Sequence, residues 1–308
     1  MAAPIHRSES PSGGPTIIVA VTTVQPSVAT LRAGDDVDAV FACARKDRLT
    51  ARSGVPYLAL ELRDRSGAIQ ARAFRDADVL AGRFERGELV RVRGRVDRFR
   101  DELQVEVRDI ARAEAADPAA FLPVAYRDVD ELDGFLEHLA REVHDPGYAA
   151  LLERLLGDGE LRAAWRRAPC TRGGHHAYLG GLLEHTVAVA TLALEAAQLH
   201  PRLNSDLLIT AALVHDLGKT REFTYGAAIG LSDEGRLLGH LVLGQGLLEE
   251  RMGGLDADRR LALLHCVLCH HGADGAPGRR FGSAEALALF RLNALDASVK
   301  GALEHGLG

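Results

Sequence analysis

Apolar and polar residues alternate over most of the first third of the chain. In the clearest example, residues 89–96, Val90, Val92 and Val96 alternate with arginines. Because successive side chains of a strand point to opposite faces of a sheet, this pattern predicts a half-buried strand. Five such strands are predicted at residues 37–43, 57–62, 68–74, 88–96 and 103–110, with a further short strand at 17–23.

A turn and a short helix lie between these strands. Asp64 to Gly67 has the composition of a hairpin turn, and residues 76–84 are predicted to be helical. Five strands with a helix between the third and the fourth is the order of an OB-fold barrel. We therefore expect a flexible segment at residues 1–25 and an OB-fold domain at residues 26–116.

Beyond Ala115-Ala116-Asp117-Pro118 the chain is predicted to be helical to its end. Asp128 is the expected N-cap of a helix that runs to His144, where Asp145-Pro146-Gly147 should stop it. The predicted helices span residues 128–144, 147–156, 159–168, 180–199, 205–217, 236–252, 257–270 and 283–303. The predicted fold is therefore multidomain α and β: an N-terminal five-stranded OB-fold β-barrel, then an all-α helical bundle at residues 117–308.

The composition allows two domains and contains no membrane or export signal. The chain has 308 residues, of which 47% are hydrophobic, but no apolar stretch reaches the roughly 18 residues that span a bilayer. Residues 1–16 lack the charged start and apolar core of a signal peptide. We therefore expect a cytoplasmic protein with no membrane partner. Cys266 and Cys269 form a single Cys-x-x-Cys inside an apolar helix, which favours core thiols over a metal knuckle.

The charge distribution leaves room for nucleic acid at the barrel. The net charge is −6, yet residues 31–113 hold 18 Lys and Arg against 15 Asp and Glu. OB-fold barrels bind single strands by stacking bases on aromatic side chains beside a positive groove. An ordinary arginine-rich surface is the alternative, because strand alternation turns neighbouring residues to opposite faces. The candidate nucleic-acid-binding residues are Tyr57, Arg72, Phe74, Arg91, Arg93 and Phe99.

The helical part holds a concentration of metal-ligand residue types. Twelve of the 13 histidines lie beyond residue 137, and His215-Asp216 ends the apolar run 207–214. Imidazole nitrogen with carboxylate oxygen suits Mn, Fe, Zn or Co. Lys219 follows closely enough to place a positive charge beside an anionic substrate. These residues predict a hydrolase that uses a metal-activated water, whereas the alternative is a helix end that makes local hydrogen bonds.

Four segments of the helical part resemble the HD superfamily of metal-dependent phosphohydrolases. They are residues 175–186, His215-Asp216 with Lys219, Gly239-His240, and His270-His271-Gly272. With an OB-fold in front of them, the chain is similar to the YhaM-type 3′→5′ exoribonucleases over residues 30–300.

The resemblance implies an HD domain at residues 117–308 and a set of site residues. It makes His185, His215 and Asp216 metal ligands, and His240, His270 and His271 the ligands of a second metal position. Asp216 and Lys219 would be catalytic, with Lys219 neutralising a phosphate oxygen. The implied cofactor is a divalent metal, Mn²⁺ first, with Fe, Co or Zn as alternatives. The implied partner is single-stranded RNA or DNA. The sequence is compatible with a homo-oligomer but does not determine the oligomeric state. For His240, a helix-start role without a metal is the alternative.

One residue departs from the family pattern. The resemblance places an Asp ligand on the last helix, where this chain has Asn293, and Asp296 three residues later could substitute for it or support another ligand. An amide oxygen can coordinate a cation but brings no negative charge. Two alternatives to an exonuclease therefore remain: an HD phosphohydrolase of small nucleotides, and a nucleic-acid-binding protein with weakened catalysis.

Overall fold

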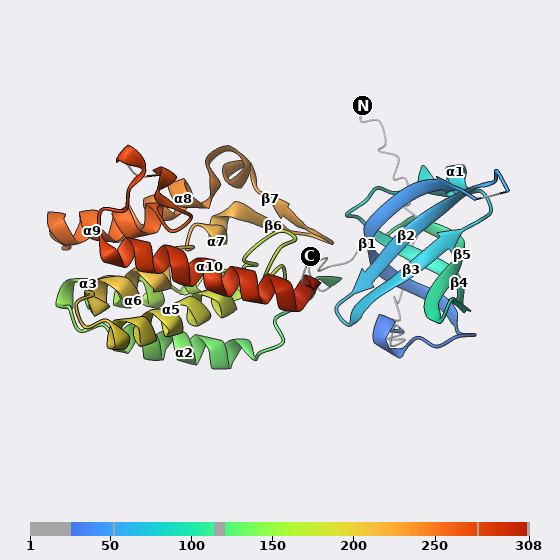
Figure 1. Cartoon of the computed structure of the whole chain (residues 1–308). Helices are drawn as coiled ribbons and strands as arrows, with labels where there is room; N and C mark the ends of the chain where they lie inside the picture. The colour runs from blue at the N-terminus through green and yellow to red at the C-terminus, as the bar shows by residue number, and fades with distance from the viewer. Residues whose placement is uncertain (1–25, 52, 114–120, 276, 307–308) are drawn as a thin grey trace, which may run out of the picture.

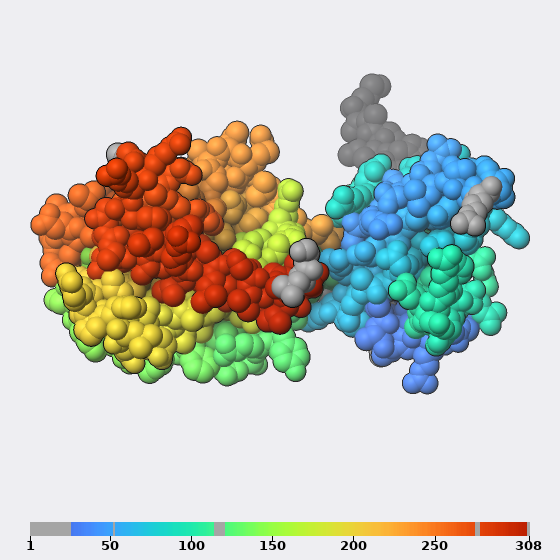
Figure 2. Space-filling model, viewed as in Figure 1, coloured from blue at the N-terminus to red at the C-terminus, as the bar shows by residue number. Residues whose placement is uncertain are grey.

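The computed structural model describes residues 26–51, 53–113, 121–275 and 277–306, which form two lobes joined at a narrow waist (Figures 1 and 2). The N-terminal lobe is a β-barrel and the C-terminal lobe is mainly helical. The predicted flexible segment at 1–25, with its strand at 17–23, lies outside the described residues, as does the predicted boundary near residues 115–118.

The N-terminal lobe is a closed five-stranded barrel with the order β1-β2-β3-β5-β4. The long first strand pairs with both β2 and β4, helped by a register shift between Cys43 and Arg45. Parallel pairing of β3 with β5 closes the barrel. Its elements are β1 (Asp36–Thr50), β2 (Pro56–Asp64), β3 (Gly67–Ala73), α1 (Ala77–Ala81), β4 (Leu89–Phe99) and β5 (Glu102–Arg112). The predicted OB-fold order is thereby confirmed.

The alternating valines of β4 point into the barrel as predicted. Val90, Val92 and Val96 are at most 1% exposed, while the arginines between them face solvent. Burying a side chain of this size contributes about 1.5–3 kcal/mol relative to leaving it exposed. Leu80 and Phe84, in and after α1, belong to the same core and cover part of the barrel. Strand β1 runs past the predicted end at Cys43, because backbone pairing with β2 continues through a polar segment.

The C-terminal lobe packs its helices around two apolar ones, α5 and α6. Every residue of α6 from Leu207 to Val214 is buried, and α5 contacts α2, α4, α6 and α10. The helices are α2 (Val129–Arg141), α3 (Pro146–Gly157), α4 (Gly159–Arg167), α5 (Gly181–Leu199), α6 (Ser205–Val214), α7 (Lys219–Glu222), α8 (Asp233–Glu249), α9 (Ala257–Leu268) and α10 (Ala284–His305). None in the described part of the chain is long and apolar enough to cross a membrane.

The helix boundaries follow local capping. Asp128 caps α2 as predicted, accepting hydrogen bonds from the backbone nitrogens of Asp130 and Glu131. The helix ends at Arg141 and not at His144, and Asp145 serves as the N-cap of α3, with Pro146 in its first turn. Proline suits that position because the first backbone nitrogens of a helix have no intrahelical acceptor.

The lobe is not purely helical. A hairpin of β6 (Phe223–Tyr225) and β7 (Ile229–Leu231) follows α7 and was not predicted. Three-residue strands are too short for an alternating pattern to identify them. The hairpin lies on the side of the helical lobe that faces the barrel (Figure 1).

Candidate metal centre

His215 and Asp216 lie directly after α6, and their side chains are fully buried. His215 is 0% exposed and Asp216 is 1% exposed. Because α6 is buried from Leu207 to Val214 and packs against α5, α9 and α10, its end delivers the two polar side chains into the interior. Such burial is unfavourable for a carboxylate unless charged or polar partners surround it.

The Asp216 carboxylate lies between two sets of side chains. Its Oδ2 is 2.7 Å from Lys219 Nζ, 3.3 Å from His215 Nε2 and 3.5 Å from His185 Nε2. Its Oδ1 is 3.3 Å from His270 Nε2 and 3.5 Å from His240 Nε2. One carboxylate therefore faces two separate groups of imidazoles.

Backbone carbonyls fix the orientation of two of these imidazoles. His215 Nδ1 is 2.8 Å from the carbonyl of Ala212, and His270 Nδ1 is 2.6 Å from that of Val267. A carbonyl can only accept, so each Nδ1 donates and each Nε2 keeps its lone pair free for a metal.

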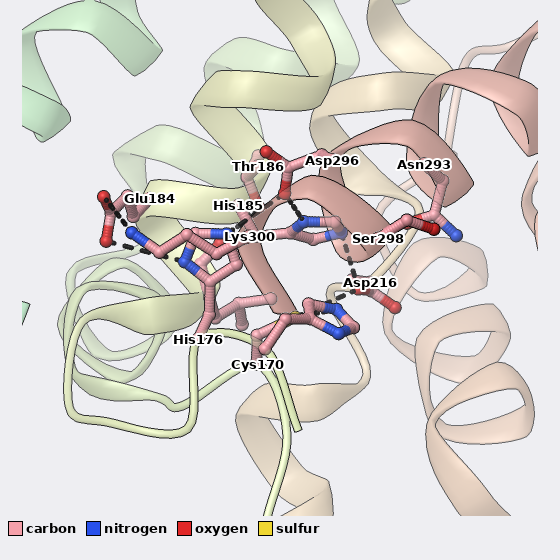
Figure 3. Close-up of polar contacts among 12 residues, drawn as sticks. Cys170, His176, Glu184, His185, Thr186, Asp216, Asn293, Asp296, Ser298 and Lys300 are labelled. Carbon is pink, nitrogen blue, oxygen red and sulfur yellow. Dashed lines mark hydrogen bonds and ion pairs between the residues drawn. The ribbon is translucent and has the colours of Figure 1, made fainter. Parts of the chain in front are cut away.

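Asp296 fixes the orientation of His185 in the same way (Figure 3). Its Oδ2 is 2.6 Å from His185 Nδ1 and 3.0 Å from His176 Nε2. His185 Nε2 then faces His215 Nε2, 3.2 Å away. Asp296 thus orients His185, a candidate ligand, which is the supporting role considered for it above. Its carboxylate contacts two imidazoles, those of His185 and His176.

His240 and His271 complete the group on the Oδ1 side. Their Nε2 atoms are 2.9 Å apart. His240 begins a new helical segment, because Gly239 breaks α8 with φ of 70°, and Glu222 accepts a hydrogen bond from the His240 backbone nitrogen. The backbone of His240 passes so close to Gly218 that a Cβ at Gly218 would lie 2.0 Å from the His240 carbonyl oxygen. His240 is therefore both a helix-start residue and a member of the cluster.

Asn293 lies beside the cluster at 6% exposure. Its Nδ2 donates to the carbonyl of His270 over 3.2 Å, so it holds the turn that carries His270 and His271. Its predicted role as a ligand stays a prediction.

The protonation states suit metal binding. Burial lowers the pKa of His215 and of His270, and burial together with neighbouring charge lowers that of His271 to about 3. Burial opposes ionisation of Asp216, but the positive charge of Lys219 outweighs it and holds the Asp216 pKa well below its ordinary value. His215, His270 and His271 are thus neutral imidazoles beside an ionised carboxylate.

The donor atoms fit a divalent cation. Asp216 Oδ1 and His270 Nε2 are buried and have no hydrogen-bond partner, although buried polar atoms are nearly always paired. The ligand atoms of Asp216, His240, His270 and His271 lie within 4.8 Å of one another, as do those of His185, His215 and Asp216. An N/O donor set of this kind suits Mn, Fe, Co or Zn.

A second polar network next to the site was not predicted (Figure 3). Glu184 accepts from Tyr178 over 2.7 Å and from Lys300 over 3.2 Å, and Tyr178 Oη is 2.9 Å from His176 Nδ1. The network ties the start of α5 to α10. His176 was part of the motif noted above, but nothing in the sequence indicated Lys300, which lies 116 residues from Glu184.

Four of the six predicted nucleic-acid-binding residues form one cluster on the barrel. The Tyr57 and Phe74 rings are 5.6 Å apart, and the Arg72 guanidinium lies 5.7 Å from the Tyr57 ring and 5.2 Å from the Phe99 ring. Phe74 and Phe99 are each 45% exposed. We call Tyr57, Arg72, Phe74 and Phe99 the aromatic cluster.

Arg91 and Arg93 have a different environment. Both are exposed on β4 and contact Asp38 of β1, at 2.6 Å and 3.3 Å. Such exposed pairs are worth at most about 1 kcal/mol, so the contact with Asp38 does not hold either guanidinium group firmly. Both arginine side chains are more than half exposed.

Comparison with known proteins identifies both lobes. Residues 42–112 match the OB-fold nucleic acid binding domain, and residues 182–298 match the HD domain. Proteins named 3′-5′ exoribonuclease YhaM from Bacillus velezensis and Bacillus subtilis are each 29% identical over 244 residues, covering 78% of this chain and 77% of theirs. The Listeria monocytogenes protein of that name is 26% identical over 276 residues, 86% of both chains.

A solved OB-fold domain of replication protein A from Methanococcus maripaludis is 16% identical and covers 30% of this chain and 97% of that one, with a TM-score of 0.25, which adds nothing to the sequence matches. With an OB-fold nucleic acid binding domain followed by a metal-binding HD domain, the chain is a homologue of the 3′-5′ exoribonucleases named YhaM.

Proposed function

We propose that this protein is a metal-dependent 3′→5′ exoribonuclease that hydrolyses phosphodiester bonds of single-stranded RNA. The observation that carries the proposal is the Asp216 carboxylate, which faces imidazoles on both sides in a chain that also holds an OB-fold barrel. Small-nucleotide hydrolysis would leave the barrel and its aromatic cluster without a role.

Asp216 and the surrounding histidines would hold the divalent cation. His240, His270 and His271 would bind a cation on the Oδ1 side of Asp216, and His185 and His215 would serve a position on its Oδ2 side, with Asn293 as the predicted additional ligand. We propose Mn²⁺ as the ion, one of the cations, with Fe, Co and Zn, that nitrogen and oxygen donors suit. When bound, a divalent cation acidifies a water and neutralises the charge that develops on the phosphodiester.

Lys219 supplies a positive charge next to the reacting phosphate. Its Nζ lies 2.7 Å from Asp216 Oδ2, and Asp216 raises the Lys219 pKa although burial opposes the charge. A permanently charged ammonium here stabilises phosphate oxygens during hydrolysis. Imidazole ligands carry no negative charge, so they would not cancel the positive charge that the cation presents to the phosphate.

The barrel holds the single strand. Bases stack on Tyr57, Phe74 and Phe99, with Arg72 between the rings, and Arg91 and Arg93 contact the phosphate backbone. DNA is a second polymer that this mode of binding accepts. The cytoplasmic location stays a prediction.

The test is a gel assay with 5′-labelled single-stranded RNA and Mn²⁺. The parent and the control Asp233→Ala, whose side chain is 92% exposed, should shorten the RNA one nucleotide at a time from its 3′ end. Asp216→Ala should bind RNA without shortening it. Cleavage by Asp216→Ala at the parental rate would contradict the site assignment. Intact RNA with folded, metal-loaded parent would favour the binding-protein alternative, for which the absence of a carboxylate at Asn293 is the supporting observation.

A further inference from the structure

Cys170 lies against the metal centre, on the Oδ2 side of Asp216. Its side chain is 0% exposed. Its Sγ is 3.7 Å from His175 Nε2, 3.9 Å from Asp216 Oδ2 and 3.4 Å from Lys219 Nζ. The ligand atoms of Cys170, His175 and His185 all lie within 4.8 Å of one another. The nitrogen that His185 can offer is Nε2, because Nδ1 is engaged by Asp296.

These spacings are close to those of a tetrahedral site. Bonds of about 2.3 Å to sulfur and about 2.0 Å to nitrogen or oxygen place the donors roughly 3.5 Å apart. Three separations between these donors can be compared with that value: 3.7 Å from Cys170 Sγ to His175, 3.9 Å from Sγ to Asp216, and 3.5 Å from Asp216 Oδ2 to His185. Each of these three separations is within about 0.4 Å of the tetrahedral spacing.

The loop that carries two of the donors is held in place. Thr171 Oγ1 donates to the carbonyl of His175 over 2.7 Å and accepts from the nitrogen of Gly174 over 2.9 Å. The Cys170 nitrogen donates to the carbonyl of His176 over 3.1 Å. A loop fixed by its own hydrogen bonds loses little freedom when it binds an ion, which favours affinity.

We propose that Cys170, His175, His185 and Asp216 form a binding site for a thiophilic divalent cation of the Zn²⁺ type, distinct from the nitrogen and oxygen position at Asp216 Oδ1. The Lys219 ammonium competes with any ion for Asp216 Oδ2. The ions that gain most from a thiolate therefore have the advantage, and thiolate selects Zn²⁺ over Mn²⁺. His185 Nε2 also faces His215, so an ion here takes that nitrogen from the His185, His215 and Asp216 group.

Co²⁺ is the probe, because a thiolate ligand gives it a charge-transfer absorption band. The full-length protein is titrated with Co²⁺, alongside Cys170→Ser and the matched control Cys269→Ser. Cys269 is a suitable control because it is also buried and its Sγ lies 3.7 Å from a histidine, His265, but no carboxylate completes the pair among the described candidate sites. We expect the band in the parent and in Cys269→Ser, its loss in Cys170→Ser, and its disappearance when Zn²⁺ is added.

A second variant keeps the thiol in place. His175→Gln should weaken Co²⁺ binding by at least about tenfold, as even the loss of a supporting residue commonly does. Any one of four results would overturn the proposal: no band in the parent, a band that persists in Cys170→Ser, a band that is lost in both cysteine variants, or parental Co²⁺ affinity in His175→Gln. None of these readouts uses RNA cleavage, so the site and the exoribonuclease function can fail separately.

Discussion

Asp296 Oδ2 lies 2.6 Å from Nδ1 of His185, a residue 111 positions earlier in the chain. Because the carboxylate can only accept, His185 Nδ1 carries the proton and Nε2 is left free to face His215 and Asp216. A carboxylate behind a ligating histidine fixes the ring and increases its basicity.

Asp296→Asn should therefore weaken metal binding without removing a ligand. The variant keeps the side-chain shape but loses the charge behind His185, and we expect a loss of about 10- to 100-fold in metal affinity. Isothermal titration with Mn²⁺ measures it. The control is Asp274→Asn, whose side chain is 92% exposed, and equal affinities for the two variants would exclude a supporting role for Asp296.

Asn293→Asp tests whether position 293 is a ligand position. The change gives up the hydrogen bond from Nδ2 to the carbonyl of His270 but adds a negative charge beside the metal centre. We expect higher Mn²⁺ affinity or faster cleavage, read from titration and single-turnover rates. Unchanged or lower values of both would assign Asn293 to holding the His270 turn alone.

Phe99→Ala should weaken the binding of single-stranded RNA. Removing one stacking platform from the aromatic cluster costs about 1–3 kcal/mol per base, measured by fluorescence anisotropy with a labelled oligonucleotide. Phe135→Ala is a matched control, because Phe135 is 41% exposed and lies 5.3 Å from the Arg127 guanidinium in the helical lobe. A similar loss in both variants would argue against a specific role for the cluster.

Asp145 should make a pH-dependent contribution to the stability of the helical lobe. It caps α3 and lies 2.7 Å from Arg259 of α9, and the hydrogen bond from Arg259 outweighs desolvation and lowers the Asp145 pKa. A lowered carboxyl pKa gives stability that is complete above the unfolded pKa, about 3.9, and is lost as the pH falls towards the folded value.

Thermal unfolding of Asp145→Ala and Asp145→Asn separates the two contributions. The alanine variant should lose about 1 kcal/mol or more, because it removes both the cap and the ion pair. The asparagine variant should lose less at neutral pH, since asparagine also caps helices. Its difference from the parent should shrink in acid, and a difference that grew in acid would contradict the assignment.

Much of the architecture follows from local sequence. The alternation of Val90, Val92 and Val96 predicts β4 because a strand has a period of two, and side chains such as Asp128 mark helix starts through hydrogen bonds to nearby backbone. The apolar run before His215-Asp216 likewise indicates a buried helix that ends at polar residues. These signals depend only on residues close together in the chain.

Other features depend on contacts between distant segments. Arg91 and Arg93 are candidate nucleic-acid-binding residues from sequence, but their shared contact with Asp38 depends on the pairing of β1 with β4. The hairpin of β6 and β7 was missed because its strands are too short to show a period. Asp296 could not be assigned between ligand and support until its distance from His185 was known.

The sequence by itself determined the two domains and their order, and it indicated most of the histidines and acids around the candidate metal centre, because periodicity and motifs depend on neighbouring residues. Only the tertiary structure decided which atoms of those side chains meet. The packing of α5, α6 and α10 sets Asp296 behind His185 and divides the surroundings of Asp216 between its two oxygens. The tertiary structure also places Cys170, a buried thiol with no distinguishing sequence pattern, 3.7 Å from His175 Nε2 and 3.9 Å from Asp216 Oδ2.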